Sequence, residues 1–113
     1  MKRFHSIKKN SEFREVYRKG TSYANKLLVM YVYPSEKEET RIGISVSKKI
    51  GNSVVRHRTT RVIREIFRLH EKELEKGLNI VVVARQAAKE SDYKHIESAF
   101  MHLCGLHRIA VNS

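Results

Sequence analysis

Cysteine, proline and long apolar runs are nearly absent from this chain. Its 113 residues include one cysteine, Cys104, one proline, Pro34, and no tryptophan. A single cysteine excludes an internal disulfide and is typical of a reducing, cytoplasmic environment. No apolar run approaches the roughly 18 residues that a membrane-spanning helix needs. The basic start, Met1 to Asn10, is not followed by an apolar stretch, so we expect no secretory signal and predict a cytoplasmic protein.

Acidic residues are also scarce. Twelve Asp and Glu stand against 23 Lys and Arg, which gives a formal net charge of +11 and a pI of about 10.0. So much charge of one sign repels itself within a small domain and typically serves contact with a polyanion. Nucleic acid is the first candidate partner and an anionic membrane surface the second. The third possibility is a basic protein without such a partner. The distribution of the charge along the chain distinguishes among the three.

Hydrophobic patterning predicts a single α+β domain over residues 1–113, since there is no linker, repeat or low-complexity tract. We expect the order α-β-β-α-β-α and a two-layer sandwich, with helices packed on a small sheet. The strand–long helix–strand unit predicts a parallel crossover, which base rates make right-handed. The expected elements are a helix capped by Asn10 and ending before Gly20, strands Lys26–Tyr33 and Arg41–Ser47, a helix from about Ser53 to His70, strand Leu78–Ala84, and a helix capped by Ser91 or Asp92.

The long helix separates apolar residues from cations. Successive residues of a helix are turned by ~100°, and this spacing places the apolar residues and the cations on opposite sides. From Lys48 to Arg68 there are seven Lys and Arg and only one acidic residue, Glu65. The apolar side holds Val55, Val62, Ile63, Ile66, Phe67 and Leu69, and the opposite side holds His57, Arg61, Arg64 and Arg68, flanked by Arg56 and Arg58.

A solvated helix face would normally mix the two signs of charge. Unlike pairs at i, i+4 help a helix, and like pairs cost ~0.2–0.5 kcal/mol each. Arginine also outnumbers lysine here, which favours bidentate phosphate contacts. A membrane-lying helix is a poorer interpretation because the apolar face is needed to cover the sheet. The helix therefore predicts phosphate binding, and charge alone leaves DNA open as the partner.

No constellation of a protein active site is present. Two acidic clusters, Glu36–Glu39 and Glu71–Glu75, read as solvating charge at a turn and a helix exit. His102 and His107 are close to Cys104, but their spacing points them to different helical faces, so zinc is not expected. We predict no catalytic residue and no metal ligand on the protein.

The stretch SKKIGNSVVRHRTTRVIREIF, Ser47 to Phe67, resembles the most characteristic motif of the bacterial ribonuclease P protein family. That pattern reads S-K-K-x-G-N-A-V-x-R-N-R-x-K-R-x-x-R-E/Q-x-F. The resemblance extends from Lys8 through Arg85 into the last helix. Two departures from it matter, His57 in place of Asn and Thr60 in place of Lys. The matching residues are Ser47, Lys48, Lys49, Gly51, Asn52, Val54, Arg56, Arg58, Arg61, Arg64, Glu65 and Phe67.

The resemblance implies a left-handed crossover, against the base rates. It also implies a role in endonucleolytic removal of the 5′ leader of precursor tRNA, catalysed by an RNA subunit with magnesium ions. The expected partners are that RNA subunit and precursor tRNA, not DNA. The expected residues for binding the RNA subunit are Lys48, Lys49, Asn52, Arg56, His57, Arg58, Arg61, Arg64 and Arg68.

A second expected site is a cleft for the leader between the first helix and the sheet. The family resemblance implies an aromatic lining at Phe13, Tyr17 and Tyr31, and aromatic platforms suit single-stranded RNA. We expect Lys8, Lys9 and Arg14 at the rim. Alternatively, Phe13 and Tyr17 only anchor the helix to the sheet.

Two other functions stay open at this point. One is a non-catalytic structural RNA-binding protein, such as a ribosomal component. The other is a protein nuclease that acts without RNA. Cleavage measured with and without the RNA subunit separates the three.

Overall fold

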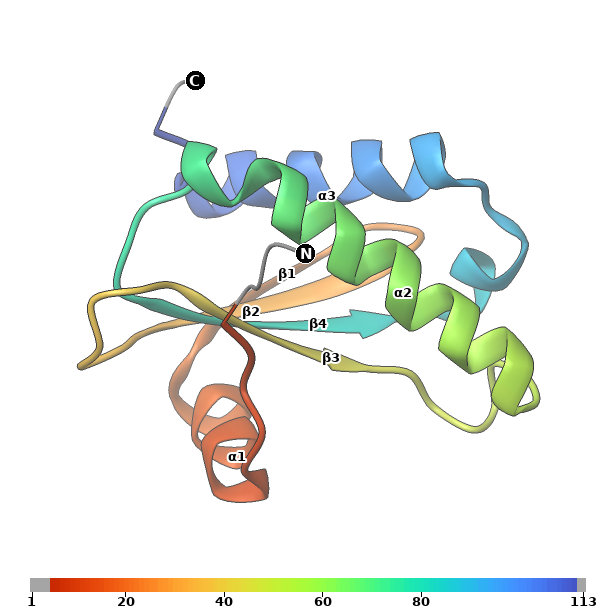
Figure 1. The fold of residues 1–113 in the computed structure, drawn as a ribbon, viewed down its shortest axis with the longest axis horizontal. Helices are drawn as coiled ribbons and strands as arrows, with labels where there is room; N and C mark the ends of the chain where they lie inside the picture. Colours follow the sequence, from red (N-terminus) through yellow and green to blue (C-terminus); the bar gives the residue numbers. More distant parts are fainter. Residues whose placement is uncertain (1–4, 112–113) are drawn as a thin grey trace.

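The computed structural model describes residues 5–111 as a four-stranded sheet with helices on both faces (Figure 1). The first four residues of the basic start, 1–4, lie outside the described part. The predicted order of helices and strands is confirmed, with one strand added. The elements are α1 Asn10–Lys19, β1 Thr21–Ala24, β2 Leu28–Pro34, β3 Arg41–Ser45, α2 Ser53–His70, η1 Glu71–Glu73, β4 Leu78–Ala84, η2 Gln86–Glu90 and α3 Tyr93–His107.

The additional strand is β1, which forms an antiparallel hairpin with β2. Its four residues, TSYA, are all exposed, and Ser22 pairs with Tyr31. The side-chain oxygen of Asn25 accepts hydrogen bonds from the N–H groups of Leu27 and Leu28, at 3.1 and 3.0 Å, and so holds the turn. No hydrophobic alternation marks these residues, because a short, exposed edge strand needs none.

The connection from β3 through α2 to β4 is left-handed. The sheet order is β1-β2-β4-β3, and β3 pairs with β4 in parallel, with Ile42 opposite Ile80. Both strands run from left to right in Figure 1, β3 lies nearer the viewer, and α2 returns above them. The right-handed crossover expected from base rates is therefore wrong. A right-handed turn would have placed α2 on the face that α1 covers.

Alternation along the strands gives the sheet two different faces. The larger core lies beneath α2 and α3, where Met30, Ile63 and Phe100 are fully buried. The smaller core lies beneath α1 and contains Val16 and Val81. The predicted sandwich thus describes the sheet with α2 and α3, and α1 adds a layer on the opposite face.

Two details of the helices differ from expectation. The first helix begins at Asn10 itself, so Asn10 does not cap it, and Lys9 occupies the cap position without a side-chain hydrogen bond. Leu69 was expected on the buried side of α2 but is 51% exposed, because it lies beyond the edge of the apolar stripe.

For α3 the predicted cap is confirmed, since Asp92 accepts a hydrogen bond from the N–H of His95 at 2.9 Å.

His70 ties the end of α2 to η1 and α3. Its Nδ1 lies 3.1 Å from Oε2 of Glu73, and its Nε2 lies 2.7 Å from Oε2 of Glu97. Burial of the ring opposes the charged form, but hydrogen bonds to Glu97 and Glu73 and the charges of both outweigh it. The pKa of His70 is therefore raised above its ordinary value.

This arrangement predicts a pH-dependent contribution to stability. A raised folded-state pKa stabilises the fold fully below the unfolded-state pKa of about 6.5, and the contribution is lost as pH rises through the folded-state value. We expect wild type to exceed His70→Gln in free energy of unfolding by an amount that shrinks as pH rises from about 6.

Chemical denaturation at a series of pH values measures this difference. Burial lowers the pKa of His107, which gives the opposite pH dependence, but that term is common to both proteins and cancels in the subtraction. A difference that stays constant or grows with rising pH would contradict the role given to His70.

Candidate nucleic-acid interface

The cations of α2 lie on the side away from its buried stripe. The buried residues of the helix are Thr59, Ile63, Ile66 and Phe67. His57, Arg58, Arg61 and Arg64 are exposed, whereas Arg56 and Arg68 are half-buried. The structure thus brings the predicted row together on one helix. We call Lys48, Lys49, Arg56, His57, Arg58, Arg61, Arg64 and Arg68 the basic surface.

The two lysines of the basic surface are held next to the start of α2. The N–H of Lys49 donates to Oγ of Ser47 at 3.1 Å, and the N–H of Ile50 donates to the carbonyl oxygen of Ser47 at 3.0 Å. Ile50 is buried and anchors this turn, so Lys48 and Lys49 remain exposed. The first turn of α2 has no acidic residue, and its positive dipole end adds to these charges.

Asn52, predicted to contact RNA, has a structural role that the sequence did not assign. Its side-chain oxygen accepts a hydrogen bond from the N–H of Val55 at 3.0 Å and caps α2. The cap holds the helix start beside the two lysines. A contact of Asn52 with RNA remains a prediction and would use the side-chain N–H₂ group.

Arg68 differs from the rest of the row because it is paired. Its Nη2 and Nε donate to the two carboxylate oxygens of Glu65 at 2.6 and 2.9 Å. The hydrogen bond from Arg68, with its charge, lowers the pKa of the Glu65 carboxyl. The predicted phosphate contact of Arg68 would therefore compete with this pair.

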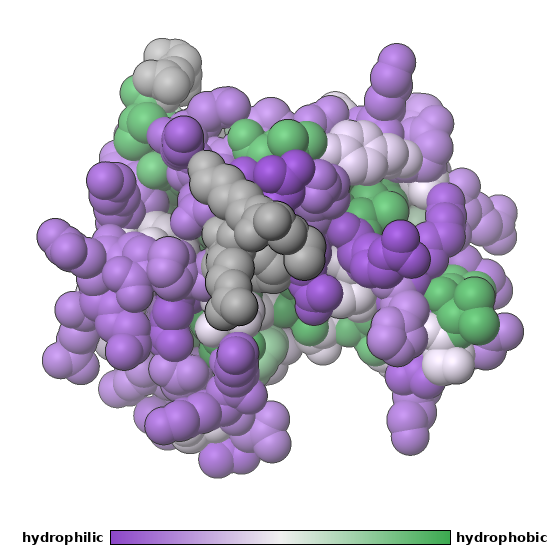
Figure 2. All heavy atoms as spheres, in the orientation of Figure 1, coloured by the Kyte–Doolittle hydropathy of each residue, from purple (hydrophilic) through white to green (hydrophobic). Residues whose placement is uncertain are grey.

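The face that carries α2 is mostly hydrophilic, and its apolar patches are small and separate (Figure 2). A helix lying on a membrane needs a free apolar face. In α2 that face is buried against the sheet. Within residues 5–111, no helix is both long and apolar enough to span a bilayer.

Three aromatic rings meet where α1 lies over the sheet. The ring centroids of Tyr17 and Tyr31 are 4.9 Å apart in an edge-to-face arrangement, and those of Phe13 and Tyr17 are 6.3 Å apart. Phe13 and Tyr31 are half-buried, but Tyr17 is 37% exposed. The structure therefore brings the three predicted residues together, and Tyr17 is the most exposed of them. We call them the aromatic cluster.

The small residues of β3 make room for this cluster. A Cβ atom at Gly43 would lie 2.6 Å from Cζ of Phe13, so the ring occupies the space that a side chain would fill. Arg41 of β3 also fixes α1, since its Nη2 donates to Oε2 of Glu12 at 2.6 Å. That hydrogen bond lowers the pKa of Glu12. The cluster therefore anchors α1 and also leaves one ring accessible.

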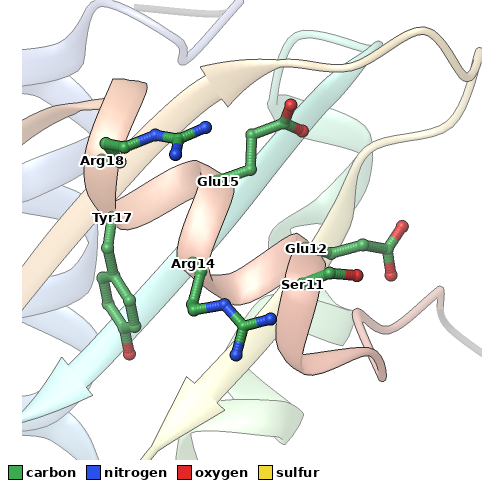
Figure 3. A pocket seen from close by; sticks show the side chains of 6 residues that line it. All are labelled: Ser11, Glu12, Arg14, Glu15, Tyr17 and Arg18. Atoms are coloured by element: carbon green, nitrogen blue, oxygen red, sulfur yellow. The ribbon is translucent and has the colours of Figure 1, made fainter.

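Arg14 and Tyr17 line an open pocket along α1, together with Ser11, Glu12, Glu15 and Arg18. Figure 3 shows Arg14 and Tyr17 projecting from the same side of the helix, toward the ends of β3 and β4. Lys8 and Lys9 are exposed just before α1. Arg14 therefore lies beside Tyr17 of the aromatic cluster, whereas a rim position for Lys8 and Lys9 remains a prediction. Tyr33 and Val83, which pack beside it, were missed, although alternation along β2 and β4 would have indicated them.

The two acidic clusters meet at the other end of the sheet. Glu38 and Glu39 line one cavity with Glu71 and Glu75 from η1 and the segment that follows it, and Lys72 and Lys76 lie among them. The sequence separated these clusters, and the fold joins them. Anionic RNA is repelled by such an end, so it contrasts with the basic surface.

The residues His102, Cys104 and His107, which the sequence places close together, make separate contacts in the structure. His102 lies 3.1 Å from the side-chain nitrogen of Asn25, and Nε2 of His107 lies 2.9 Å from the carbonyl oxygen of Met30. Burial, with the charge of Glu73, raises the pKa of the Cys104 thiol to about 12. No group of three or more His, Cys, Asp and Glu side chains among residues 5–111 is placed to hold a metal ion.

Known proteins match this chain over nearly its whole length, in sequence and in fold. A sequence model of the family Ribonuclease P matches residues 1–107. The ribonuclease P protein component of Lachnoclostridium phytofermentans is 53% identical over 108 residues, covering 96% of this chain and 93% of that protein. The ribonuclease P protein of Staphylococcus aureus is 38% identical with a TM-score of 0.88, and 96% of this chain and 99% of that chain are covered.

The ribonuclease P protein of Thermotoga maritima is more distant in sequence but retains the fold. It is 25% identical with a TM-score of 0.81, covering 88% of this chain and 94% of that chain. The motif that spans the β3–α2 loop and most of α2, the four-stranded sheet and the match over nearly the full length agree with one another. The chain therefore belongs to the ribonuclease P protein family.

Proposed function

We propose that this protein binds the RNA subunit of ribonuclease P through the basic surface and the 5′ leader of precursor tRNA beside the aromatic cluster. It thereby assists endonucleolytic removal of the leader. The observation that carries the proposal is the position of the two surfaces. The cations lie on α2, on one face of the sheet, and the aromatic cluster lies under α1, on the other. One domain can thus contact two RNAs at once.

Catalysis is assigned to the RNA subunit with its magnesium ions. On the protein, the carboxylates nearest the aromatic cluster include Glu12, which is held by Arg41. The acidic cavity at the other end carries two lysines. Neither arrangement offers a pair of free, converging carboxylates to activate water with a metal. The protein's part is to bind and position RNA.

Reconstitution with the RNA subunit tests this function. Precursor tRNA is incubated with protein, RNA subunit or both, at a magnesium concentration that limits the RNA alone. We expect cleavage at the mature 5′ end to be fastest with both and absent with protein alone. Specific cleavage by protein freed of all RNA would instead indicate a protein nuclease. Binding to RNA without any effect on cleavage would favour a structural RNA-binding protein.

The aromatic cluster predicts a leader-specific loss. Tyr31→Ala removes a ring that supports Tyr17, so the holoenzyme should bind precursor tRNA about 1–3 kcal/mol more weakly, the worth of one stacked base. Binding of mature tRNA, which has no leader, should change little. Tyr23→Ala is the matched control, because Tyr23 is an exposed tyrosine of β1 whose ring packs on His107 instead. Equal losses for both RNAs would indicate destabilisation of the fold.

A further inference from the structure

A groove between β3 and the first half of α2 carries more than positive charge. Ile44 and Val46 form its wall on the strand side, and Arg56, Thr60 and Arg64 belong to its wall on the helix side. Ser53, His57 and Arg61 complete the lining. A surface that only attracts phosphates needs no aliphatic wall, because phosphate contacts are polar.

Arg56 is the residue that sets this groove apart from the exposed cations. It is half-buried, and its Nε has no hydrogen-bond partner among the described residues although water cannot reach it. An enclosed donor without a partner is unfavourable in the free protein. Arg61, by contrast, is exposed and free to act as a simple charge.

The strand side of the groove also offers backbone groups. β3 is an edge strand. Among residues 5–111, its outer edge pairs with the N-terminal segment only at Ile42, through hydrogen bonds with His5 and Ile7 of 3.1 and 2.8 Å. Alternate residues of a strand direct their N–H and C=O groups to the same edge, so those of Ile44 point outward as well. Beyond Ile42, no described residue bridges to this edge.

Thr60 keeps the groove open. Its hydroxyl donates to the carbonyl oxygen of Arg56 at 2.9 Å, which turns the polar end of the side chain back onto the helix. The family motif usually has lysine at this position, and a lysine would place a long chain along the same wall. The departure from the motif therefore opens space beside the Arg56 guanidinium.

We propose that this groove receives an unpaired base of the RNA subunit, stacked on the Arg56 guanidinium and against Ile44 and Val46. Unpaired bases in RNA stack on arginine planes and present their edges for hydrogen bonding, which the N–H and C=O of Ile44 can supply. Arg61 and Arg64 bind phosphates at the rim. The inference rests on the proposed function and adds a base contact to what was a contact with phosphates.

The test compares two charge-conserving substitutions. Lysine keeps the charge of arginine but lacks its plane and its fork of donors. We expect Arg56→Lys to weaken binding of the RNA subunit at least about tenfold without changing the salt dependence, because a stacking contact is lost. Arg108→Lys is the matched control, because Arg108 is exposed at the end of α3 and belongs to neither proposed RNA-binding surface, and it should remain within about twofold of wild type. Binding of Arg56→Lys within about twofold of wild type would overturn the proposal.

Base-specific chemical probing of the RNA subunit gives a second measurement. An unpaired base that is reactive in free RNA should be protected by wild type and by Arg108→Lys, and exposed again with Arg56→Lys. Thr60→Leu fills the groove without altering charge and should also restore reactivity, so the test survives if Arg56→Lys fails to fold. Protection that persists in both groove variants would overturn the base site.

The same experiment separates this inference from the proposed function. If wild type shows no salt-dependent binding of the RNA subunit, the proposed function itself fails. If it binds and the groove variants behave as wild type, only the base site is lost.

Discussion

Replacing Arg58 and Arg61 together with alanine is expected to weaken binding of the RNA subunit by roughly 10- to 100-fold near 0.15 M salt. Both side chains are exposed on α2, so their loss removes two phosphate contacts and leaves the fold intact. For wild type, about four to six neutralised phosphates predict a slope of log affinity against log salt of roughly −3 to −5. In the double variant the slope should be less steep by about 2, one for each contact.

The control is Lys72→Ala with Lys76→Ala, which removes the same charge from the acidic end of the molecule. Both lysines are exposed. A salt titration beside a melting curve gives the result for each protein. An unchanged slope in the arginine variant, an equal loss in the lysine control, or a loss matched by unfolding would mean that α2 carries an ordinary solvated face.

Phe67→Ala should cause the largest loss of stability, about 3–5 kcal/mol, because a fully buried aromatic side chain leaves a cavity that the core fills only in part. Phe67 lies on the side of α2 that faces the sheet. Chemical denaturation measures the loss directly. Leu69→Ala, two residues further along the same helix, removes a side chain that is 51% exposed and should change stability by no more than about 0.5 kcal/mol.

These two substitutions test the division of α2 into a buried side and a cationic side. Losses of similar size for Phe67→Ala and Leu69→Ala would show that the helix is turned differently about its axis. In that case the exposure of the arginines, and with it the basic surface, would need another explanation.

The elements that bury an apolar face could be predicted from the sequence. The stripe of α2 and the apolar run of β4 follow directly from hydrophobic periodicity, and both elements were placed within a residue or so of their observed bounds. β1 could not be predicted, because a strand whose four residues are exposed has no pattern to read. The handedness of the crossover depends on which face of the sheet α2 covers, and periodicity carries no information on that choice.

The candidate surfaces divide in the same way. The arginines and His57 of the basic surface were predicted because they share one helix, and periodicity along a helix places them relative to one another. The groove beside Arg56 was not, because its walls come from β3 and α2. Alternation along β3 and the residue after it is enough to place Ile44 and Val46 on one side of the strand, but how α2 is turned above them depends on tertiary packing. The acidic cavity was missed for the same reason, since the turn between β2 and β3 meets η1 only in the fold.

Sequencing of the RNA that co-purifies with the tagged protein tests the central claim most directly. Cells expressing wild type and the Arg58→Ala/Arg61→Ala variant are compared at equal protein yield. The account predicts one dominant structured RNA with wild type, the RNA subunit of ribonuclease P, and a strong loss of that RNA with the variant. A broad mixture of ribosomal fragments, or the same RNA at the same level with both proteins, would contradict it.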